Sequence, residues 1–305
     1  MVVFILRRAT TGIGVILAVV TVVFLLVRLT GNPAAALLPN EASVKDYHLL
    51  VRDLGLDKPI YVQYGIFLKK LAVGDFGFSA KTRVQVIDLL KERLPNSLKL
   101  SLVSMLMVMI MGLPLGALAA VKRGKGLDWM VRLIVAVGQC LPTFWLALLL
   151  MQLVAIKWEI LPVSGMESFS HYIIPAFSLA LYPTAEIMRI LRSSMIEVLD
   201  SEYIKLARIK GVSETKVIWK HAFRNAVISV TTLSGLYIIL LAMGAVIVET
   251  IFGWPGIGRM LWEGVLSRDF TVVQAVVFVT TCLVVLANLL VDILYMYIDP
   301  RIRYT

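Results

Sequence analysis

Long apolar runs are the feature of this sequence that most restricts the folds open to it. A helix of about 20 residues is needed to cross the hydrocarbon core of a membrane. Five runs reach that length, at residues 10–29, 98–121, 130–156, 232–252 and 272–297. With 59% apolar and 16% charged residues, the chain could not cover these runs with polar surface in water. We therefore expect an integral membrane protein.

A sixth run at 172–190 is a weaker span, because it contains Pro175, Pro183 and Glu186. The basic residues around it favour it, since lysine and arginine near span ends stay on the cytoplasmic side. With six spans, four segments lie inside: 1–9, 122–132, 188–230 and 298–305. Together these segments carry 16 basic and 6 acidic residues. Their excess of basic over acidic residues equals the net charge of the whole chain, +10. We predict six helices with both termini in the cytoplasm.

The same topology explains the basicity without a nucleic-acid partner; anionic lipid headgroups are expected to contact the inner rim instead. Only helices or closed barrels satisfy their backbone in lipid. The alternating apolar pattern of a barrel strand does not occur in the runs. The predicted class is therefore an all-α membrane protein, with residues 1–305 forming a single transmembrane domain.

The sequence offers no catalytic chemistry of its own. An ATP-binding phosphate loop needs Gly-x-x-x-x-Gly-Lys-[Ser/Thr], and the nearest fragment, at 124–126, lacks the first glycine and the hydroxyl residue. The three histidines stand in separate segments, without metal-ligand spacing. Cys140 and Cys282 fall inside predicted spans and are expected to be packing residues. We expect no catalytic residue, metal site or bound cofactor in this chain.

Two polar segments lie between spans. Residues 31–97 are predicted outside, as short helices broken by turns, and either a cap over the outer mouth or a plain connector fits them. Residues 193–228 are predicted inside. There, 201–210 fits an amphipathic helix, Gly211 a left-handed C-terminal position, and Ser213 the N-cap of a second helix that begins with Glu214. This helix-turn-helix could dock a partner or lie flat on the headgroups.

A third segment interrupts the helical pattern after residue 249. Pro255 and the glycines around it cannot continue a regular helix. Irregular backbone at the end of a span is tolerated against protein or a water-filled cavity. We predict a gate or mouth element from the following candidates: Glu249, Trp254, Pro255, Gly256 and Gly258.

Polar residues inside the predicted spans are expected to face protein or water, because burying a charge in lipid is costly. Asn288 and Asp292 are four residues apart and share one helix face. Together with Glu186 they are assigned to polar packing between helices, in preference to substrate contact.

Several stretches together resemble one family. Residues 202–211, Glu-Tyr-Ile-Lys-Leu-Ala-Arg-Ile-Lys-Gly, with 220–226, Lys-His-Ala-Phe-Arg-Asn-Ala, are similar to the coupling loop of permeases of binding-protein-dependent ABC importers. Residues 54–59, 74–79 and 249–258 resemble other segments of the dipeptide, oligopeptide and nickel permeases, in their "B" subunit form. The superfamily signature Glu-Ala-Ala-x-x-x-Gly is incomplete, because Lys205 and Leu206 replace its first two residues. That departure leaves open which side chain makes the main ionic contact with the ATPase.

The resemblance implies a type I ABC importer permease in the bacterial inner membrane that forms half of a translocation pathway and works by alternating access. It implies a second permease subunit, two ABC ATPase subunits that bind ATP and Mg, and an extracytoplasmic substrate-binding protein. Contacts with the ATPase are expected from Glu202, Tyr203, Ala207, Arg208, Lys210, Gly211, Ser213 and His221.

The cargo and one rival mechanism stay open. Short peptides are the family's commonest cargo, and nickel, glutathione or another small solute are the alternatives. A secondary transporter or channel would need no ATPase, but it would be expected to show inverted repeats or a filter-like ring. The sequence shows no convincing internal repeat.

Overall fold

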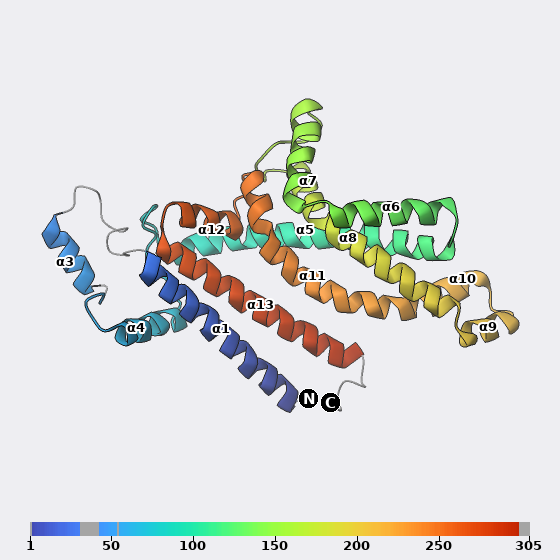
Figure 1. Ribbon diagram of the computed structural model, residues 1–305, viewed down its shortest axis with the longest axis horizontal. Coiled ribbons are helices and arrows are strands. Elements are labelled where there is room, and N and C mark those ends of the chain that lie inside the picture. Colours follow the sequence, from blue (N-terminus) through green and yellow to red (C-terminus); the bar gives the residue numbers. More distant parts are fainter. Residues whose placement is uncertain (1, 31–42, 54, 299–305) are drawn as a thin grey trace. The chain divides into compact units, whose positions relative to one another are not determined.

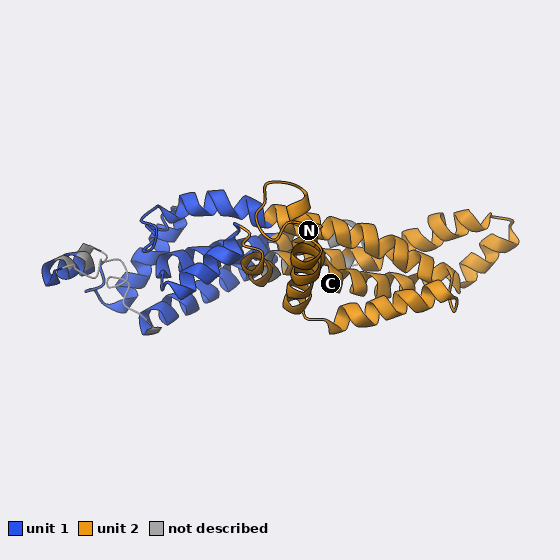
Figure 2. Cartoon of the chain, turned by 90° about the horizontal axis from the view of Figure 1, so that it is seen from above, with its two compact units in different colours: residues 1–97, 255–286 blue, residues 98–254, 287–305 orange. Residues whose placement is uncertain are grey.

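The computed structural model describes residues 2–30, 43–53 and 55–298 (Figure 1). Part of the predicted outer segment, at 31–42, part of the motif at 54–59 and the C-terminal residues 299–305 lie outside the described residues. The chain divides into two compact units (Figure 2). Unit 1 comprises Met1–Ser97 and Pro255–Leu286, and unit 2 comprises Leu98–Trp254 and Ala287–Thr305.

Unit 1 contains α1 (Val2–Thr30), α3 (Val44–Asp53), α4 (Ile60–Ala72) and α12 (Ile257–Leu266), the first turns of α5 (Val86–Val121) and most of α13 (Phe270–Ile298). Aromatic packing joins α1 to α4: the buried Phe24 ring lies 5.2 Å from that of Tyr64 and 5.3 Å from that of Phe67. A second core holds α5, α12 and α13 together around Val86, Met260 and Val272.

Unit 2 contains the rest of α5, followed by α6 (Gly126–Cys140), α7 (Thr143–Leu150), the π-helix η1 (Met151–Lys157) and α8 (Ser170–Leu199). After α8 come α9 (Glu202–Ile209), α10 (Glu214–Lys216), the π-helix η2 (Val217–Phe223) and α11 (Arg224–Ile251). Helix α8 packs against α6, α7 and α11. It stays helical through Pro175 and Pro183, both buried, so the weak span predicted at 172–190 is confirmed as part of a long helix.

Glycines on α5 and α6 allow α8 to approach closely. A Cβ added at Gly116 would lie 3.0 Å from the Met188 carbonyl oxygen, and one at Gly112 would lie 3.0 Å from Ile187 Cγ2. On α6, a Cβ at Gly138 would lie 3.0 Å from Ala185 Cβ. Small residues four apart are typical of close helix pairs in membranes, where packing rather than the hydrophobic effect drives association.

Gly116→Ala is expected to destabilise the protein by about 1–3 kcal/mol, because the new methyl group meets the backbone of α8 and one of the helices must move. The measurement is the thermal unfolding midpoint of the detergent-solubilised protein. Gly14→Ala in α1 is the matched control, since nothing lies within 4 Å of a Cβ at that position. The control should be neutral or slightly stabilising; equal midpoints for the two variants would contradict the close packing at Gly116.

Among the described residues, four helices are long and apolar enough to cross a membrane: α1, α5, α8 and α13. The structure corrects the prediction of one continuous helix over 130–156, because α6 and α7 meet there at a bend of 104°. Leu141 and Pro142 are extended at the break, with ψ of 121° and 135°. A proline disfavours the helical region for the residue before it and provides no N–H for the helix.

If the bent pair is one span, the described residues contain five candidate spans. The predicted span at 232–252 lies in α11 up to that helix's last residue, Ile251. Helix α11 is 28 residues long but is not among these five. Four or five spans are therefore supported by the structure, and the sixth stays a prediction.

Candidate functional site

The first candidate site is a helical hairpin at residues 201–223, in unit 2. Helix α9 begins after Ser201, whose backbone is extended at ψ 152°. At its end, the Val212 N–H donates to the Ala207 carbonyl over 3.1 Å and the Gly211 N–H donates to the Arg208 carbonyl over 3.0 Å. These two bonds form a Schellman motif, which needs a left-handed residue at its turn. Gly211 provides it at φ +77°, as predicted.

The second arm of the hairpin differs in detail from the prediction. Ser213 is extended and precedes α10, but its side chain makes no cap hydrogen bond, so the predicted N-cap contact is absent. Helix α10 is a single turn that continues directly into the wider π-helix η2 and then into α11. Val217 and Ala222 of η2 are fully buried, as is Ile204 of α9. These three apolar side chains form the inside of the hairpin, and α9 packs against η2.

An ion pair closes the hairpin. The guanidinium of Arg208 donates to both carboxylate oxygens of Glu214, over 3.1 Å and 2.7 Å. The hydrogen bond from Arg208 outweighs partial burial and lowers the pKa of Glu214, while the bond to Glu214 raises the pKa of Arg208. In addition, Asn225 Nδ2 donates to the Tyr203 hydroxyl over 2.7 Å, which fixes α9 to the start of α11.

Three large apolar side chains of the hairpin are exposed. Leu206 is 55% exposed, Ile209 81% and Trp219 47%. We call these three residues the apolar patch; exposed lysines lie beside them in the sequence at 205, 210, 216 and 220. An exposed apolar patch with a polar rim marks a surface that binds another protein or a membrane. Sequence reasoning had not singled out these three residues, although the spacing of Leu206 and Ile209 already places them on one face of α9.

All the predicted coupling residues lie in the hairpin. Glu202, Tyr203, Ala207 and Arg208 belong to α9, Lys210, Gly211 and Ser213 to the turn, and the half-buried His221 to η2. Glu202 pairs with Lys205 over 2.7 Å. The structure thus brings these positions together in one hairpin.

A buried ion pair lies on the adjoining helices. The carboxylate of Asp128 on α6 is 1% exposed and accepts hydrogen bonds from Arg192 on α8 over 2.6 Å and 2.9 Å. The Gly124 N–H also donates to Asp128, over 2.9 Å. Arg123 of the same turn pairs with Asp200, directly after α8, over 2.9 Å. The turn between α5 and α6 is therefore fixed to the part of α8 that leads into the hairpin, which sequence reasoning missed.

The second candidate site covers the predicted gate residues. Helix α11 ends in another Schellman motif: Gly253 has φ +62°, and the Trp254 N–H donates to the Glu249 carbonyl over 2.8 Å. The Trp254 ring is fully buried and meets the Tyr172 ring edge-on at 4.6 Å between centroids. The Glu249 side chain is also buried. The helix break that was predicted here is confirmed.

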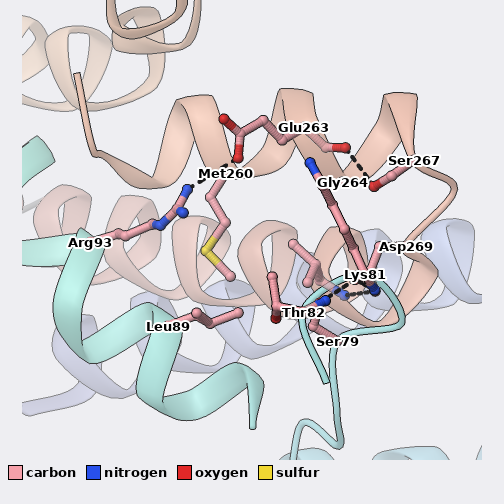
Figure 3. Close-up of a pocket in the computed structure, with 11 residues that line it drawn as sticks. Ser79, Lys81, Thr82, Leu89, Arg93, Met260, Glu263, Gly264, Ser267 and Asp269 are labelled. Atoms are coloured by element: carbon pink, nitrogen blue, oxygen red, sulfur yellow. Dashed lines mark hydrogen bonds and ion pairs between the residues drawn. The ribbon is translucent and has the colours of Figure 1, made fainter. Parts of the chain in front are cut away.

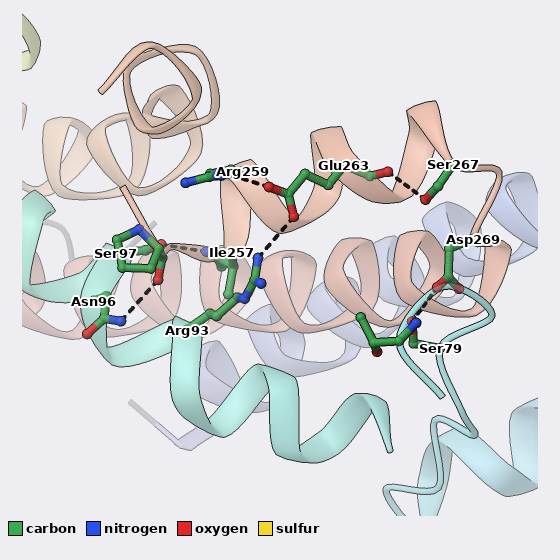
Figure 4. A network of polar contacts seen from close by, with 11 residues as sticks. Ser79, Arg93, Asn96, Ser97, Ile257, Arg259, Glu263, Ser267 and Asp269 are labelled. Atoms are coloured by element: carbon green, nitrogen blue, oxygen red, sulfur yellow. Dashed lines mark hydrogen bonds and ion pairs between the residues drawn. The ribbon is translucent and has the colours of Figure 1, made fainter. Parts of the chain in front are cut away.

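Beyond the break, unit 1 holds the start of α12 through side chains of α5 (Figure 4). Asn96 Nδ2 donates to the Pro255 carbonyl over 3.0 Å, and the Ile257 N–H donates to Ser97 Oγ over 2.8 Å. Gly256 and Gly258 are buried. The Ser97 hydroxyl thus satisfies one of the first N–H groups of α12, which have no partner within the helix.

Beyond the first turn of α12, charged side chains join this helix to α5. Glu263 lies 2.8 Å from Arg259 and 3.4 Å from Arg93 (Figure 4). Partial burial raises the pKa of the Glu263 carboxyl, but the two nearby guanidinium groups lower it by more. The net effect is a lowered pKa.

Asp269 organises the loop at 79–82. One carboxylate oxygen accepts from the Ser79 hydroxyl over 2.6 Å and from the Lys81 N–H over 3.2 Å. The other accepts from the Val272 N–H over 3.2 Å, so Asp269 also caps α13. A cavity of about 30 Å³ lies between this loop, α5 and α12 (Figure 3). Such a volume holds about one water molecule.

The residues assigned to polar packing lie apart from these sites. Glu186 on α8 accepts hydrogen bonds from Gln139 on α6 and from Arg189. Asn288 on α13 is exposed and Asp292 is half-buried. Among the described residues, no group of three or more His, Cys, Asp or Glu side chains is placed to hold a metal ion.

Comparison with known proteins decides the family. Residues 112–304 match the model of the binding-protein-dependent transport system inner membrane component, and residues 1–101 match that of its N-terminal part. The chain belongs to this family. It is a multi-pass protein of the bacterial inner membrane and a permease component of a transport system.

Two curated relatives match over essentially the whole chain. The dipeptide transport system permease protein DppB of Alkalihalophilus pseudofirmus is 37% identical, with 100% of each chain covered. The glutathione transport system permease protein GsiC of Escherichia coli is 38% identical, with 99% of each covered.

Solved structures show the same fold. A chain of the MetNI methionine ABC transporter, in an inward-facing conformation, has a TM-score of 0.60 at 19% identity, covering 70% of this chain and 97% of that one. A chain of an amino acid ABC transporter has a TM-score of 0.56 at 18% identity, covering 68% and 93%. The helical fold is that of a type I ABC importer permease.

Proposed function

We propose that this family member is one of two permease subunits of an ATP-driven importer for short peptides. It forms half of the translocation pathway, with six spans and both termini in the cytoplasm. The hairpin at 201–223 carries the proposal. It is closed by an ion pair and a Schellman turn, is joined to α8 and α11 at its two ends, and exposes an apolar patch to a partner.

In this proposal the partners of the hairpin are two ABC ATPase subunits, which bind ATP and Mg. When they close on nucleotide, they push the hairpin, and its stiff connections pass the movement to α8 and α11. The two permease halves then open alternately outward and inward. A substrate-binding protein delivers the cargo from outside, and residues 31–97 cap the outer mouth.

Short peptides are the proposed cargo because the two curated relatives are named for dipeptide and glutathione transport. Glutathione is itself a tripeptide, so the two cargoes share charged ends and amide bonds. Nickel or another small solute is the alternative. The break at 252–256 is proposed as the gate: Glu249 precedes it, Trp254, Pro255 and Gly256 lie within it, and Gly258 follows it.

The test changes the apolar patch. Ile209→Asp should weaken association with the ATPase subunits about tenfold, because a charge replaces an apolar contact at the centre of the proposed interface. The unfolding midpoint of the permease should hardly change, since Ile209 is 81% exposed. Co-purification of the ATPase subunits and ATP-driven peptide uptake in liposomes are the measurements.

Val73→Asp is the matched control, because Val73 is nearly as exposed, at 74%, but follows α4 in the outer segment. It should leave ATPase association unchanged. Undiminished association of the Ile209→Asp variant would contradict the docking role. ATP-independent uptake by the purified chain alone would instead favour a secondary transporter.

A further inference from the structure

Helix α8 has a polar stripe on its one open side. Tyr182 is 44% exposed, the Arg189 side chain is 57% exposed, and the Glu186 side chain is 14% exposed. Ser193 and Glu197 are exposed as well. We call these five residues the polar stripe. Their spacing of four, three, four and four residues places them on one helix face, while the residues between them are largely buried against neighbouring helices.

The neighbouring helices of unit 2 show the opposite pattern. Their exposed faces carry large apolar side chains, including Leu102, Leu106 and Ile110 on α5, Leu133 and Val137 on α6, and Leu236 and Leu240 on α11. Those faces suit lipid. A charged side chain near the middle of the bilayer costs about 2.5–3.5 kcal/mol and therefore faces protein or water. Tyr182, Glu186 and Arg189 fall within the predicted span at 172–190, so the exposed face that they form is unsuited to lipid for the same reason. Ser193 and Glu197 continue that face into the segment predicted inside.

Two opposite charges stand at the centre of the stripe. Glu186 lies 13 residues before the end of α8 at Leu199, roughly 20 Å along the helix axis. It is held by Gln139 of α6 and by Arg189. A guanidinium has five N–H donors, so Arg189 can bind a second carboxylate besides Glu186, with the paired geometry that arginine favours.

We propose that the polar stripe lines the substrate pathway and that Glu186 and Arg189 bind the two ends of a zwitterionic solute, such as a short peptide. Arg189 takes the α-carboxylate and Glu186 takes the α-ammonium group, both of which are charged near pH 7. Gln139 orients the Glu186 carboxylate. This inference rests on the proposed import function, because it places the stripe towards the second half of the channel.

The first test measures access of water to the stripe. In a Cys140→Ser, Cys282→Ser background, Tyr182→Cys is assembled into the complete importer and exposed to a charged maleimide. We expect it to react at least ten times faster than Leu106→Cys and Leu133→Cys, which serve as lipid-facing controls. Saturating dipeptide with the binding protein should slow the reaction at Tyr182→Cys. Labelling as slow as the controls in every nucleotide state would overturn the proposal, in favour of a stripe sealed against another subunit.

The second test separates substrate binding from helix packing. Arg189→Gln and Glu186→Gln should each lower ATP-driven dipeptide uptake about tenfold or more, the loss expected for a charge-assisted hydrogen bond. The double exchange Glu186→Arg with Arg189→Glu keeps an ion pair on adjacent turns but reverses its direction. We expect uptake to stay low. Uptake restored by the exchange would assign the pair to packing and overturn the proposal.

The control for this test is Asp88→Asn with Lys91→Gln, which removes another exposed pair at the same spacing, 3.9 Å apart. It should leave uptake unchanged, and co-purification of all subunits confirms assembly of every variant. The two proposals fail differently. Normal uptake by Arg189→Gln would refute the substrate site alone, whereas no ATP-driven uptake by the unmodified importer would refute the proposed function.

Discussion

Gly211→Val is expected to uncouple ATP hydrolysis from peptide uptake. Nothing lies within 4 Å of a Cβ at Gly211, so the substitution meets no steric obstacle from neighbours. The strain comes from φ +77°, which costs an L-residue about 1–2 kcal/mol and is especially unfavourable for a β-branched side chain. The turn must change shape, which moves α9 and the apolar patch relative to α10. The measurement is the ratio of ATP hydrolysed to peptide transported in liposomes.

Gly74→Val is the matched control, because Gly74 has φ +75° and equally open surroundings but lies in the segment 31–97, which is predicted outside. It carries the same backbone strain without touching the hairpin, so its coupling ratio should stay normal. Gly211→Asn should be milder than Gly211→Val, since asparagine tolerates the left-handed region. A normal coupling ratio for Gly211→Val would count against the hairpin as the coupling element.

Asp128→Ala should give the largest loss of stability, about 3–5 kcal/mol. It removes one partner of a largely buried ion pair and leaves the Arg192 guanidinium, 23% exposed, without its carboxylate. The bond between the Gly124 N–H and Asp128 is lost as well. The expected result is a strongly lowered thermal unfolding midpoint of the solubilised protein. Transport should fall with it, because α6 and α8 lose the ion pair that joins them towards the hairpin.

The double variant Asp128→Leu with Arg192→Leu tests the physical reason. Removing both charges leaves no buried charge unpaired, because Arg132, which lies 3.7 Å from Asp128, is an exposed side chain. Most of the stability should therefore return. Arg123→Gln is the second comparison; it removes the exposed pair with Asp200 and should cost at most about 1 kcal/mol. A double variant as unstable as Asp128→Ala would show that the charge left behind is not the cause.

Backbone features that depend on a few neighbouring residues could be predicted from the sequence. The left-handed turn at Gly211 and the break after α11 each depend on glycine or proline within a few residues. The spans rest on apolar runs, which lipid selects without reference to tertiary contacts. The proline after Leu141 was not taken into account, and the prediction of one continuous helix over 130–156 was wrong. Ser213 was predicted to cap the next helix, but its side chain makes no cap hydrogen bond.

The sequence by itself therefore determined the membrane class, the family and the position of the hairpin. Only the tertiary structure decided which charges pair, because Asp128 meets Arg192 across 64 positions and Gln139 meets Glu186 across 47. It also decided which face of α8 stays open, since that depends on the helices packed around it. Local residue patterns fix backbone conformation, whereas partners distant in the chain become neighbours only when the helices pack.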